Sequence, residues 1–416
     1  MTALLSSLRG SLHGFFKSSP WKTPNRPTKI LPAAGLVEEE CSPCYDPKHF
    51  YPARLYEVLN NRYQITAKLG WGSSSTVWLA RDLEQWRWCP TRYVAVKIKA
   101  NNYATTKDAE RDLRLVEHIS HTNPRHVGYN FVSTLLDSFT LPGPYGTHVC
   151  MVFDTLCEPL WMLRRRFDGN VLPLDVMKPI ARMLVEGLCY LHSQCHIVHT
   201  DLKSDNILMS LRDPSVLEKV TWDEVYEPLP QKHLDDRIIY LSRNYFGLEV
   251  GNLGRPVITD FGLAVDGSRI HNHVIQPDEY RAPEVIIGAG WSYSVDIWNL
   301  GVLVYLVHGS GPFDALQSDT SAFSNEKHLA RIISVIGPPP MDLLHQAKDG
   351  FRYFSAEGKF KYPELIPESE GIEGIISNIE DCDKHVFLNL LKRMLQWRPD
   401  ERGSMEDLLM DPWFQE

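Results

Sequence analysis

The chain has 416 residues, enough for a two-lobed domain with extensions, and its hydrophobic content of 43% is typical of a soluble globular protein. Its formal net charge of −9 disfavours nucleic-acid binding, and no apolar run reaches the length of about eighteen residues that a membrane-spanning helix needs. Eight scattered cysteines indicate reduced thiols, so we expect an intracellular protein of the cytoplasm or the nucleus.

Residues 1–37 form a basic N-terminal extension with five basic residues and no acid. Prolines 24, 27 and 32 would break any helix in its second half. The composition fits a mitochondrial transit peptide, which would make import into mitochondria possible, and it also fits a disordered arm. The apolar residues that recur at helical spacing among serines and lysines are Leu4, Leu5, Leu8, Leu12, Phe15 and Phe16.

Residues 38–62 form a lead-in segment that opens with three glutamates and then becomes rich in aromatic residues and proline. Cys41 and Cys44 have the spacing of half a zinc site, but no second ligand pair follows at a suitable distance, so we expect no metal there. Alternating apolar residues from Tyr63 onwards predict a strand.

A glycine-rich turn follows between two predicted strands. Glycine lets backbone amides approach a phosphate group closely, and Ser75 stands where the common pattern has a third glycine. Further along, residues 94–97 predict a strand with one lysine, Lys97, among apolar neighbours. The phosphate-binding candidates of the turn are Leu69, Gly70, Trp71, Gly72, Ser73, Ser74, Ser75, Thr76 and Val77.

Three short motifs follow in the second half of the chain. The first brings together Asp201, Lys203 and Asn206. A carboxylate that accepts a hydroxyl proton, a lysine beside the transferring phosphoryl group and an amide that binds a metal are the groups that phosphoryl transfer to a protein requires. The motifs lie at residues 199–208, 259–262 and 282–284.

In this order, the motifs resemble those of the protein kinases, although Thr200 replaces the arginine that usually precedes the catalytic aspartate. The resemblance implies an α+β, two-lobed kinase fold with a β-rich small lobe at 63–157 and a mainly helical large lobe at 158–414. It also implies ATP and Mg²⁺ as substrate and cofactor. We expect insertions in the large lobe at about 212–256 and 337–383, and we expect the first of them to be a partly ordered surface excursion.

The kinase resemblance assigns roles to single residues. Asp201 is expected to accept the proton of the substrate hydroxyl, and Lys203 to stabilise charge on the γ-phosphate. Asn206 and Asp260 are expected to bind magnesium, and Lys97 to contact the α- and β-phosphates.

Further roles concern the surroundings of these groups. Backbone groups between Asp154 and Leu156, after a buried strand, are expected to bind adenine. Asp112, on a predicted helix, is the expected ion-pair partner of Lys97, and since aspartate is shorter than the usual glutamate we expect a long or water-bridged contact. Two further pairings are expected, in which Asp296 holds the catalytic-loop backbone and Glu284 pairs with Arg402.

The chain resembles one kinase group in particular, the SR-protein kinases, which phosphorylate arginine-serine repeats. The matching residues are 69–72 with 75–80, the tyrosine-rich lead-in at 45–63, residues 150–153 and the His-Thr-Asp of 199–201. The resemblance implies a serine/threonine protein kinase whose partners are basic, arginine-serine-rich protein segments. The stretch 364–383, with seven acids and no base, is either a solvated loop or a docking surface for such segments.

Two other functions are compatible with parts of this pattern. An ATP-binding pseudokinase scaffold would explain the unusual Asp112, but Lys97, Asp201, Asn206 and Asp260 are all present. A small-molecule kinase would lack the expected pair of Glu284 with an arginine that supports a peptide platform. The catalytic motifs therefore favour an active serine/threonine protein kinase.

Overall fold

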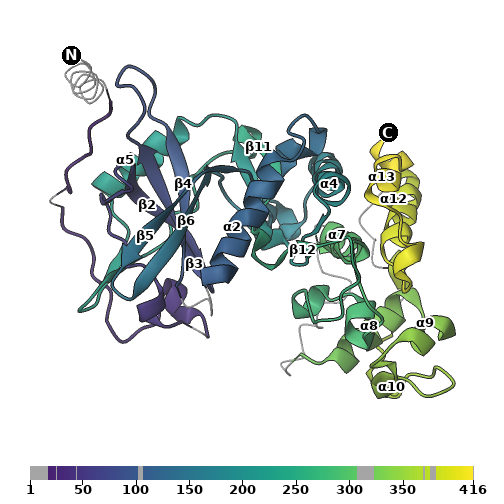
Figure 1. Ribbon diagram of the computed structural model, residues 1–416. Coiled ribbons are helices and arrows are strands. Elements are labelled where there is room, and N and C mark those ends of the chain that lie inside the picture. The colour runs from purple at the N-terminus through teal and green to yellow at the C-terminus, as the bar shows by residue number, and fades with distance from the viewer. Residues whose placement is uncertain are drawn as a thin grey trace, which may run out of the picture. The chain divides into compact units, whose positions relative to one another are not determined.

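The computed structural model describes residues 17–24, 26–43, 45–101, 106–306, 323–368, 371–374 and 381–415 (Figure 1). The chain divides into two compact units. The sheet unit takes the chain up to residue 120, then 133–158 and 210–254, and the helical unit takes 121–132, 159–209 and the chain from 255 onwards. None of the helices in the described ranges is long and apolar enough to cross a membrane.

A six-stranded antiparallel sheet forms the centre of the sheet unit, with the strand order β1-β2-β3-β4-β6-β5. Helix α2 (Thr106–His121) runs beside these strands in Figure 1. The β-rich lobe that the sequence predicts is therefore present. The strands are β1 (Val58–Leu59), β2 (Tyr63–Gly72), β3 (Ser75–Asp82), β4 (Tyr93–Lys99), β5 (Leu135–Gly143) and β6 (Gly146–Asp154).

A hydrophobic core cluster of the sheet unit lies on one face of this sheet. Side chains alternate between the two faces of a strand, and β4 turns Val94, Val96 and Ile98 to the core. Residues distant in sequence cover the same face: Leu59 comes from the lead-in segment, and Tyr240 from β10 (Ile238–Tyr240). The lead-in and the region after the catalytic loop are thus integral to this core.

The region 212–256 differs from its predicted form of a surface excursion. It contains helix α5 (Val216–Tyr226) and the hairpin of β9 (Gln231–His233) with β10, and it groups with the sheet unit rather than with the large lobe. Leu217 and Val220 are buried in α5, as is Tyr240 in β10. Its mixed charges and prolines suggested solvent exposure, but its few apolar residues are placed where they pack on the sheet.

The second half of the basic extension also differs from both predictions for it. Residues 17–24 and 26–43, which we call the N-terminal strap, lie against the sheet unit. The Trp21 backbone exchanges two 2.8 Å hydrogen bonds with the Gln64 side chain, and the Trp21 ring stacks on Trp222 of α5 at 5.0 Å. Residues 17–24 and 26–37 are therefore part of the fold. The rest of the extension predicted as a transit peptide or disordered arm, residues 1–16, lies outside the described residues.

The three glutamates of the strap, residues 38–40, bind buried lysines of the sheet unit. Glu38 and Glu39 both bind the fully buried ammonium of Lys68 on β2, and Glu38 lies 3.3 Å from it. Glu40 receives two 2.8 Å hydrogen bonds from Lys232 of β9. Because both lysines are buried, the carboxylates supply the counter-charges that burial requires.

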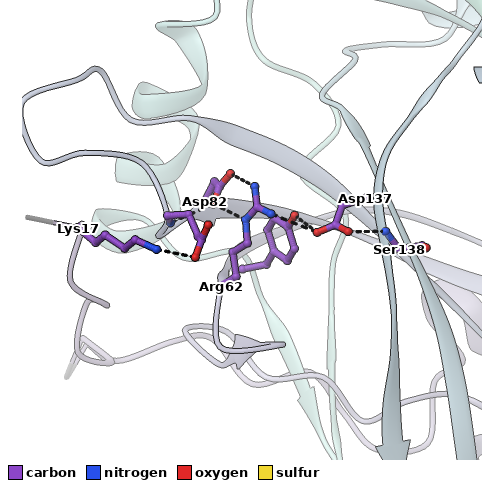
Figure 2. Close-up of polar contacts among 7 residues, drawn as sticks. Lys17, Arg62, Asp82, Asp137 and Ser138 are labelled. Carbon is purple, nitrogen blue, oxygen red and sulfur yellow. Dashed lines mark hydrogen bonds and ion pairs between the residues drawn. The ribbon is translucent and has the colours of Figure 1, made fainter. Parts of the chain in front are cut away.

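Arg62, the residue before β2, connects the end of β3 with β5 (Figure 2). Its Nε and Nη2 each donate to Asp82 at 2.8 Å, and its Nη1 lies 3.3 Å from Asp137 on β5. Burial opposes the charge on Asp82, but the hydrogen bonds from Arg62 and the Glu84 amide, together with the charges of Arg62 and Arg92, outweigh this effect and lower the pKa of that carboxyl. Nearby, Lys17 of the strap binds Glu84 at 2.6 Å.

The helical unit consists mainly of helices, as Figure 1 shows. The predicted long helix over 175–194 is α4 (Leu174–Cys189), which continues as a π-helical turn over Tyr190–Gln194. The other helices are α3 (Leu160–Arg164), α6 (Pro283–Ile287), α7 (Ser294–Leu306), α8 (Asn325–Ile336), α9 (Met341–Gln346), α10 (Gly350–Tyr353), α11 (Gly371–Gly374), α12 (Asp381–Met394) and α13 (Met405–Leu409). The short strand pairs are β7 (Ile197–Val198) with β12 (Val265–Asp266) and β8 (Ile207–Leu211) with β11 (Leu253–Ile258).

Candidate active site

The catalytic loop brings together the three residues that the first motif singled out. Lys203 Nζ lies 3.1 and 3.0 Å from the two carboxylate oxygens of Asp201. The amide nitrogen of Asn206 donates to the backbone carbonyl of Asp201 at 2.8 Å and to its carboxylate at 2.9 Å. The Asp201 carboxylate is thus oriented from two sides, and a fixed orientation is what a proton acceptor needs.

The same contacts leave the amide oxygen of Asn206 available as a metal ligand. The Thr259 amide donates to the Asn206 backbone carbonyl at 2.8 Å. Asp260 directly follows Thr259, so this bond brings the backbone of Asp260 near Asn206. Asp260 has a left-handed backbone with φ of 62°, a conformation that non-glycine residues adopt mainly at sites that constrain them. An amide oxygen and a carboxylate are ligands that suit Mg²⁺, so these residues fit the ion.

Asp296, near the start of α7, binds the backbone of the catalytic loop at residues 199 and 200. Its carboxylate is fully buried and accepts from the backbone amides of His199 at 2.7 Å and of Thr200 at 3.0 Å. Thr200 has φ of 67°, so the loop adopts a strained turn that these two bonds maintain. The expected role of Asp296 is confirmed.

The segment that begins with the third motif, which the sequence predicts to be a peptide platform, is held by a buried ion pair. Arg402 Nη1 and Nη2 each donate to Glu284 at 2.7 Å, and both side chains have no exposed surface. The pair is bidentate, and Arg402 donates further to backbone carbonyls of Ser294 and Gln396, so its donors are satisfied in the interior. This pairing is also confirmed.

Residues that carried no sequence motif complete the platform. Gln276, with φ of 68°, accepts from the amide of Ala282 at 2.8 Å and donates to Asn299 at 2.9 Å. His328 of α8 lies with Nε2 2.9 Å from the backbone carbonyl of Arg281. The sequence did not predict that either side chain would reach this loop, because only the fold brings these distant segments together.

In the sheet unit, the glycine-rich turn connects β2 to β3. Gly72 pairs with Ser75 across the turn, and Gly70 pairs with Val77. A Cβ atom added to Gly70 would meet no heavy atom within 4 Å, so packing does not explain the glycine. The absence of side-chain bulk instead agrees with close approach of a phosphate group to the backbone. Trp71 between the two glycines is 39% exposed.

Asp112 has an ion-pair partner that the sequence did not predict. Its carboxylate binds Lys99 Nζ at 2.8 Å. The pair of Asp112 with Lys97 stays a prediction. Both lysines lie on the same face of β4, since they are two residues apart, and Lys99 is buried. A regular alternation of Ala95, Lys97 and Lys99 was visible in the sequence, but only the position of α2 decides which lysine the acid meets.

The expected adenine-binding segment follows β6. Asp154 is the last residue of β6 and pairs with Val94 of β4. Asp154 is exposed and Leu156 is half-buried, while Thr155 between them is buried. Their backbone is thus positioned by the end of the central sheet.

Comparison with known proteins agrees with this geometry. The protein kinase domain family matches residues 63–221 and 243–414. A serine/threonine protein kinase of Aspergillus fumigatus is 35% identical over 97% of this chain and 98% of its own length. The serine/threonine-protein kinase SRPK of Physarum polycephalum is 30% identical over 90% of this chain and 91% of its own length.

A solved structure supports the fold separately. The crystal structure of a kinase domain superposes with a TM-score of 0.68 at 24% identity, and the match covers 89% of this chain and all of that one. The two-lobed kinase fold that the motifs implied is confirmed. The chain belongs to the protein kinase domain family, and it is a serine/threonine protein kinase, similar to SRPK-type members, that uses ATP as its phosphoryl donor.

Proposed function

We propose that this kinase transfers the γ-phosphoryl group of ATP to serines in arginine-serine-rich protein segments. The orientation of Asp201 by Lys203 and Asn206 is the observation that supports the transfer step. In this step the serine Oγ forms a bond to the γ-phosphorus, the bond from that phosphorus to the β–γ bridging oxygen breaks, and the serine proton passes to Asp201. Lys203 stabilises negative charge on the transferring group.

The residues proposed to bind ATP and Mg²⁺ are those that the kinase motifs single out. The turn at 69–77 and Lys97 of the sheet unit contact the phosphates, and backbone groups from Asp154 to Leu156 bind the adenine. Asn206 and Asp260 of the helical unit would hold Mg²⁺. Bound there, the ion would neutralise charge on the phosphate oxygens.

Two observations support an arginine-rich substrate. The relative from Physarum carries the name SRPK, and the motifs at 69–80 and 199–201 resemble that group. The stretch 364–383 supplies carboxylates, which guanidinium groups bind in a bidentate manner. Glu364 and Glu368 are exposed, while Glu373 is bound to Lys392 at 2.6 Å. The other acids of the stretch have side chains outside the described part.

A peptide assay at several salt concentrations tests this substrate class. We expect a lower KM for an arginine-serine peptide than for a matched aspartate-serine peptide, and we expect this KM to rise with salt, because exposed ion pairs are screened over roughly 8 Å at physiological ionic strength. Each such pair contributes only about 0.2–1 kcal/mol, so several must act together. Asp201→Asn provides the inactive reference.

Substitutions in the acidic stretch show where the peptide binds. Changing Glu364, Glu368, Glu370 and Glu373 to glutamine should raise the KM for the arginine-serine peptide several-fold and reduce its salt dependence. Matched neutralisation of three exposed acids in the sheet unit, Glu218, Asp235 and Glu249, should leave it unchanged. Equal KM values for the two peptides at every salt concentration would contradict the substrate class.

A further inference from the structure

The N-terminal strap begins along the loop between β3 and β4. The Ser18 amide donates to the Gln85 carbonyl at 3.1 Å, and Lys17 and Trp86 form an isolated antiparallel bridge. The rings of Trp86 and Trp88 stack at 5.1 Å, which braces this loop. The first residues of the strap thus lie against a loop that is itself held in place.

Arg87, between the two tryptophans, reaches across to the strap. Its Nε donates to the Lys17 carbonyl at 2.8 Å, and its Nη2 donates to the Ser19 hydroxyl oxygen at 2.7 Å. Among the described residues, no carboxylate forms an ion pair with Arg87, so its positive charge lacks a counter-ion there. The guanidinium therefore has N–H donors left for an anion beside a serine hydroxyl.

Ser19 is accessible to a modifying enzyme. It is exposed, and it lies in the strap outside any helix. Pro20 follows it directly, and a serine followed by proline is the acceptor that proline-directed protein kinases recognise. This acceptor differs from the arginine-serine segments proposed as substrates of the chain itself, so it indicates a separate kinase as the donor enzyme.

We propose that Ser19 is a phosphorylation site, and that Arg87 binds its phosphate group and fastens the strap to the loop between β3 and β4. A proline-directed protein kinase transfers the γ-phosphoryl group of ATP to Ser19 Oγ, with release of ADP and of the hydroxyl proton. The bond from the γ-phosphorus to the β–γ bridging oxygen breaks as the bond to Oγ forms.

The change in charge at Ser19 strengthens the contact with Arg87. A phosphoserine carries a charge of about −1.5 to −2 near pH 7 and has three strong acceptor oxygens, whereas the hydroxyl accepts one bond from Arg87. A guanidinium binds phosphate oxygens in a bidentate manner. Glu84 is an acid of the same loop, but Lys17 binds it at 2.6 Å, so its repulsion of the phosphate is reduced.

The Asp201→Asn protein is the substrate for the test, because it removes phosphorylation by the chain itself. The full chain is incubated with ATP and a proline-directed protein kinase, and mass spectrometry locates the phosphate. Amide hydrogen exchange over residues 17–24 then compares the phosphorylated and unmodified proteins. The same measurements use Arg87→Gln, an exposed change that removes the guanidinium but keeps a donor.

We expect phosphate on Ser19, and we expect Pro20→Ala to prevent it. Exchange over residues 17–24 should slow about tenfold on phosphorylation, because one added charge-assisted hydrogen bond has an effect of about this size. In Arg87→Gln the phosphate should still be added, but the exchange should not slow.

Thr23 is the matched control in the same strap. It is exposed and followed by Pro24, but among the described residues its hydroxyl has no hydrogen-bond partner. Phosphate on Thr23 in a Ser19→Ala protein should therefore leave the exchange over residues 17–24 unchanged.

Other results would count against the proposal in distinct ways. Absence of phosphate on Ser19 would overturn the site itself. Exchange that stays the same or becomes faster on phosphorylation of Ser19 would overturn the fastening of the strap. Equal slowing in Arg87→Gln and its parent, or equal slowing by phosphate on Thr23, would show that the guanidinium does not bind the phosphate.

Discussion

His328 is a buried side chain that contacts the backbone next to the third motif, at Arg281. It lies on α8 with Nε2 bound to the backbone carbonyl of Arg281, whose guanidinium binds Asp278 at 2.8 Å. Burial lowers the pKa of His328 to about 4, and the neighbouring charges of Arg281 and Arg331 act in the same direction. The histidine is therefore neutral in the folded protein near neutral pH.

This pKa predicts an acid-dependent loss of stability. Between the ordinary histidine pKa of about 6.5 and the folded value of about 4, the unfolded chain binds a proton that the folded protein does not. Folding should thus weaken by up to about 1.4 kcal/mol per pH unit as pH falls through this window. We expect His328→Gln, which retains a donor, to make Tm less dependent on pH between these values.

The matched control for this experiment is His385→Gln, since His385 is exposed on α12. That variant should keep the pH dependence of the parent protein. An identical slope of Tm against pH in both variants would show that His328 does not titrate in the way its burial requires.

At the scale of elements, residues 260–284, which correspond to the activation segment of kinases, are held by contacts that need no phosphate. Thr200 replaces the arginine that in other kinases can bind a phosphate, and its hydroxyl donates to the Leu263 carbonyl at 2.9 Å. Further along, His271 stacks on Trp291 at 4.7 Å, and the two residues exchange backbone hydrogen bonds of 2.9 Å. The segment is thus held by residues on either side of it in the chain, Thr200 and Trp291.

We therefore predict activity without phosphorylation of this segment. Ser268 is the one hydroxyl residue between 263 and 279, and it is exposed with its hydroxyl bound to Asp266 at 2.6 Å. Ser268→Ala should change kcat/KM by no more than about twofold, as exposed substitutions rarely exceed about 0.5 kcal/mol. Phosphatase treatment should have no larger effect, whereas loss of activity in either case would contradict this prediction.

At the scale of the whole molecule, segments far apart in sequence build the sheet unit together. The N-terminal strap, the lead-in and the region 212–254 all contribute to one compact body. Lys68 illustrates the dependence, because its ammonium is bound by Glu38, Glu39 and the Tyr240 carbonyl. Removal of any one of these segments would leave buried groups of the others, such as the Lys68 ammonium, without their partners.

This arrangement limits where the N-terminus can be cut. A protein that begins at Lys17 should keep the Tm and kcat of the full chain, while one that begins at residue 44 should lose several kcal/mol of stability. The reason is that Lys68 and Lys232 would remain without their acids, and breaking a buried pair costs about 3–5 kcal/mol. If residues 1–16 direct mitochondrial import, N-terminal sequencing of the protein from cells should find the cut before Lys17.

A reporter protein fused behind residues 1–16 tests import itself.

Glu218→Gln, an exposed change in the same unit, serves as the stability control for the truncated proteins. An active, stable enzyme that begins beyond residue 40 would show that the strap is dispensable.

The sequence by itself determined the parts of the site that lie close together in the chain. Asp201, Lys203 and Asn206 fall within one short loop, so their spacing indicated that they lie close together, and their hydrogen bonds agree. The kinase fold followed from the order of such local motifs. The pair of Glu284 with Arg402 was also predictable, but only because the kinase resemblance supplied its long-range partner.

The tertiary structure decided which distant groups meet. Asp112 binds Lys99 because α2 reaches the strand at that end, and a two-residue alternation cannot distinguish the lysines of one face. The strap and the region 212–254 look polar and irregular in sequence, yet their few aromatic and charged side chains meet complementary partners on the sheet. Such contacts depend on chain segments about two hundred residues apart, as between Glu40 and Lys232, and no local pattern in either segment encodes the other.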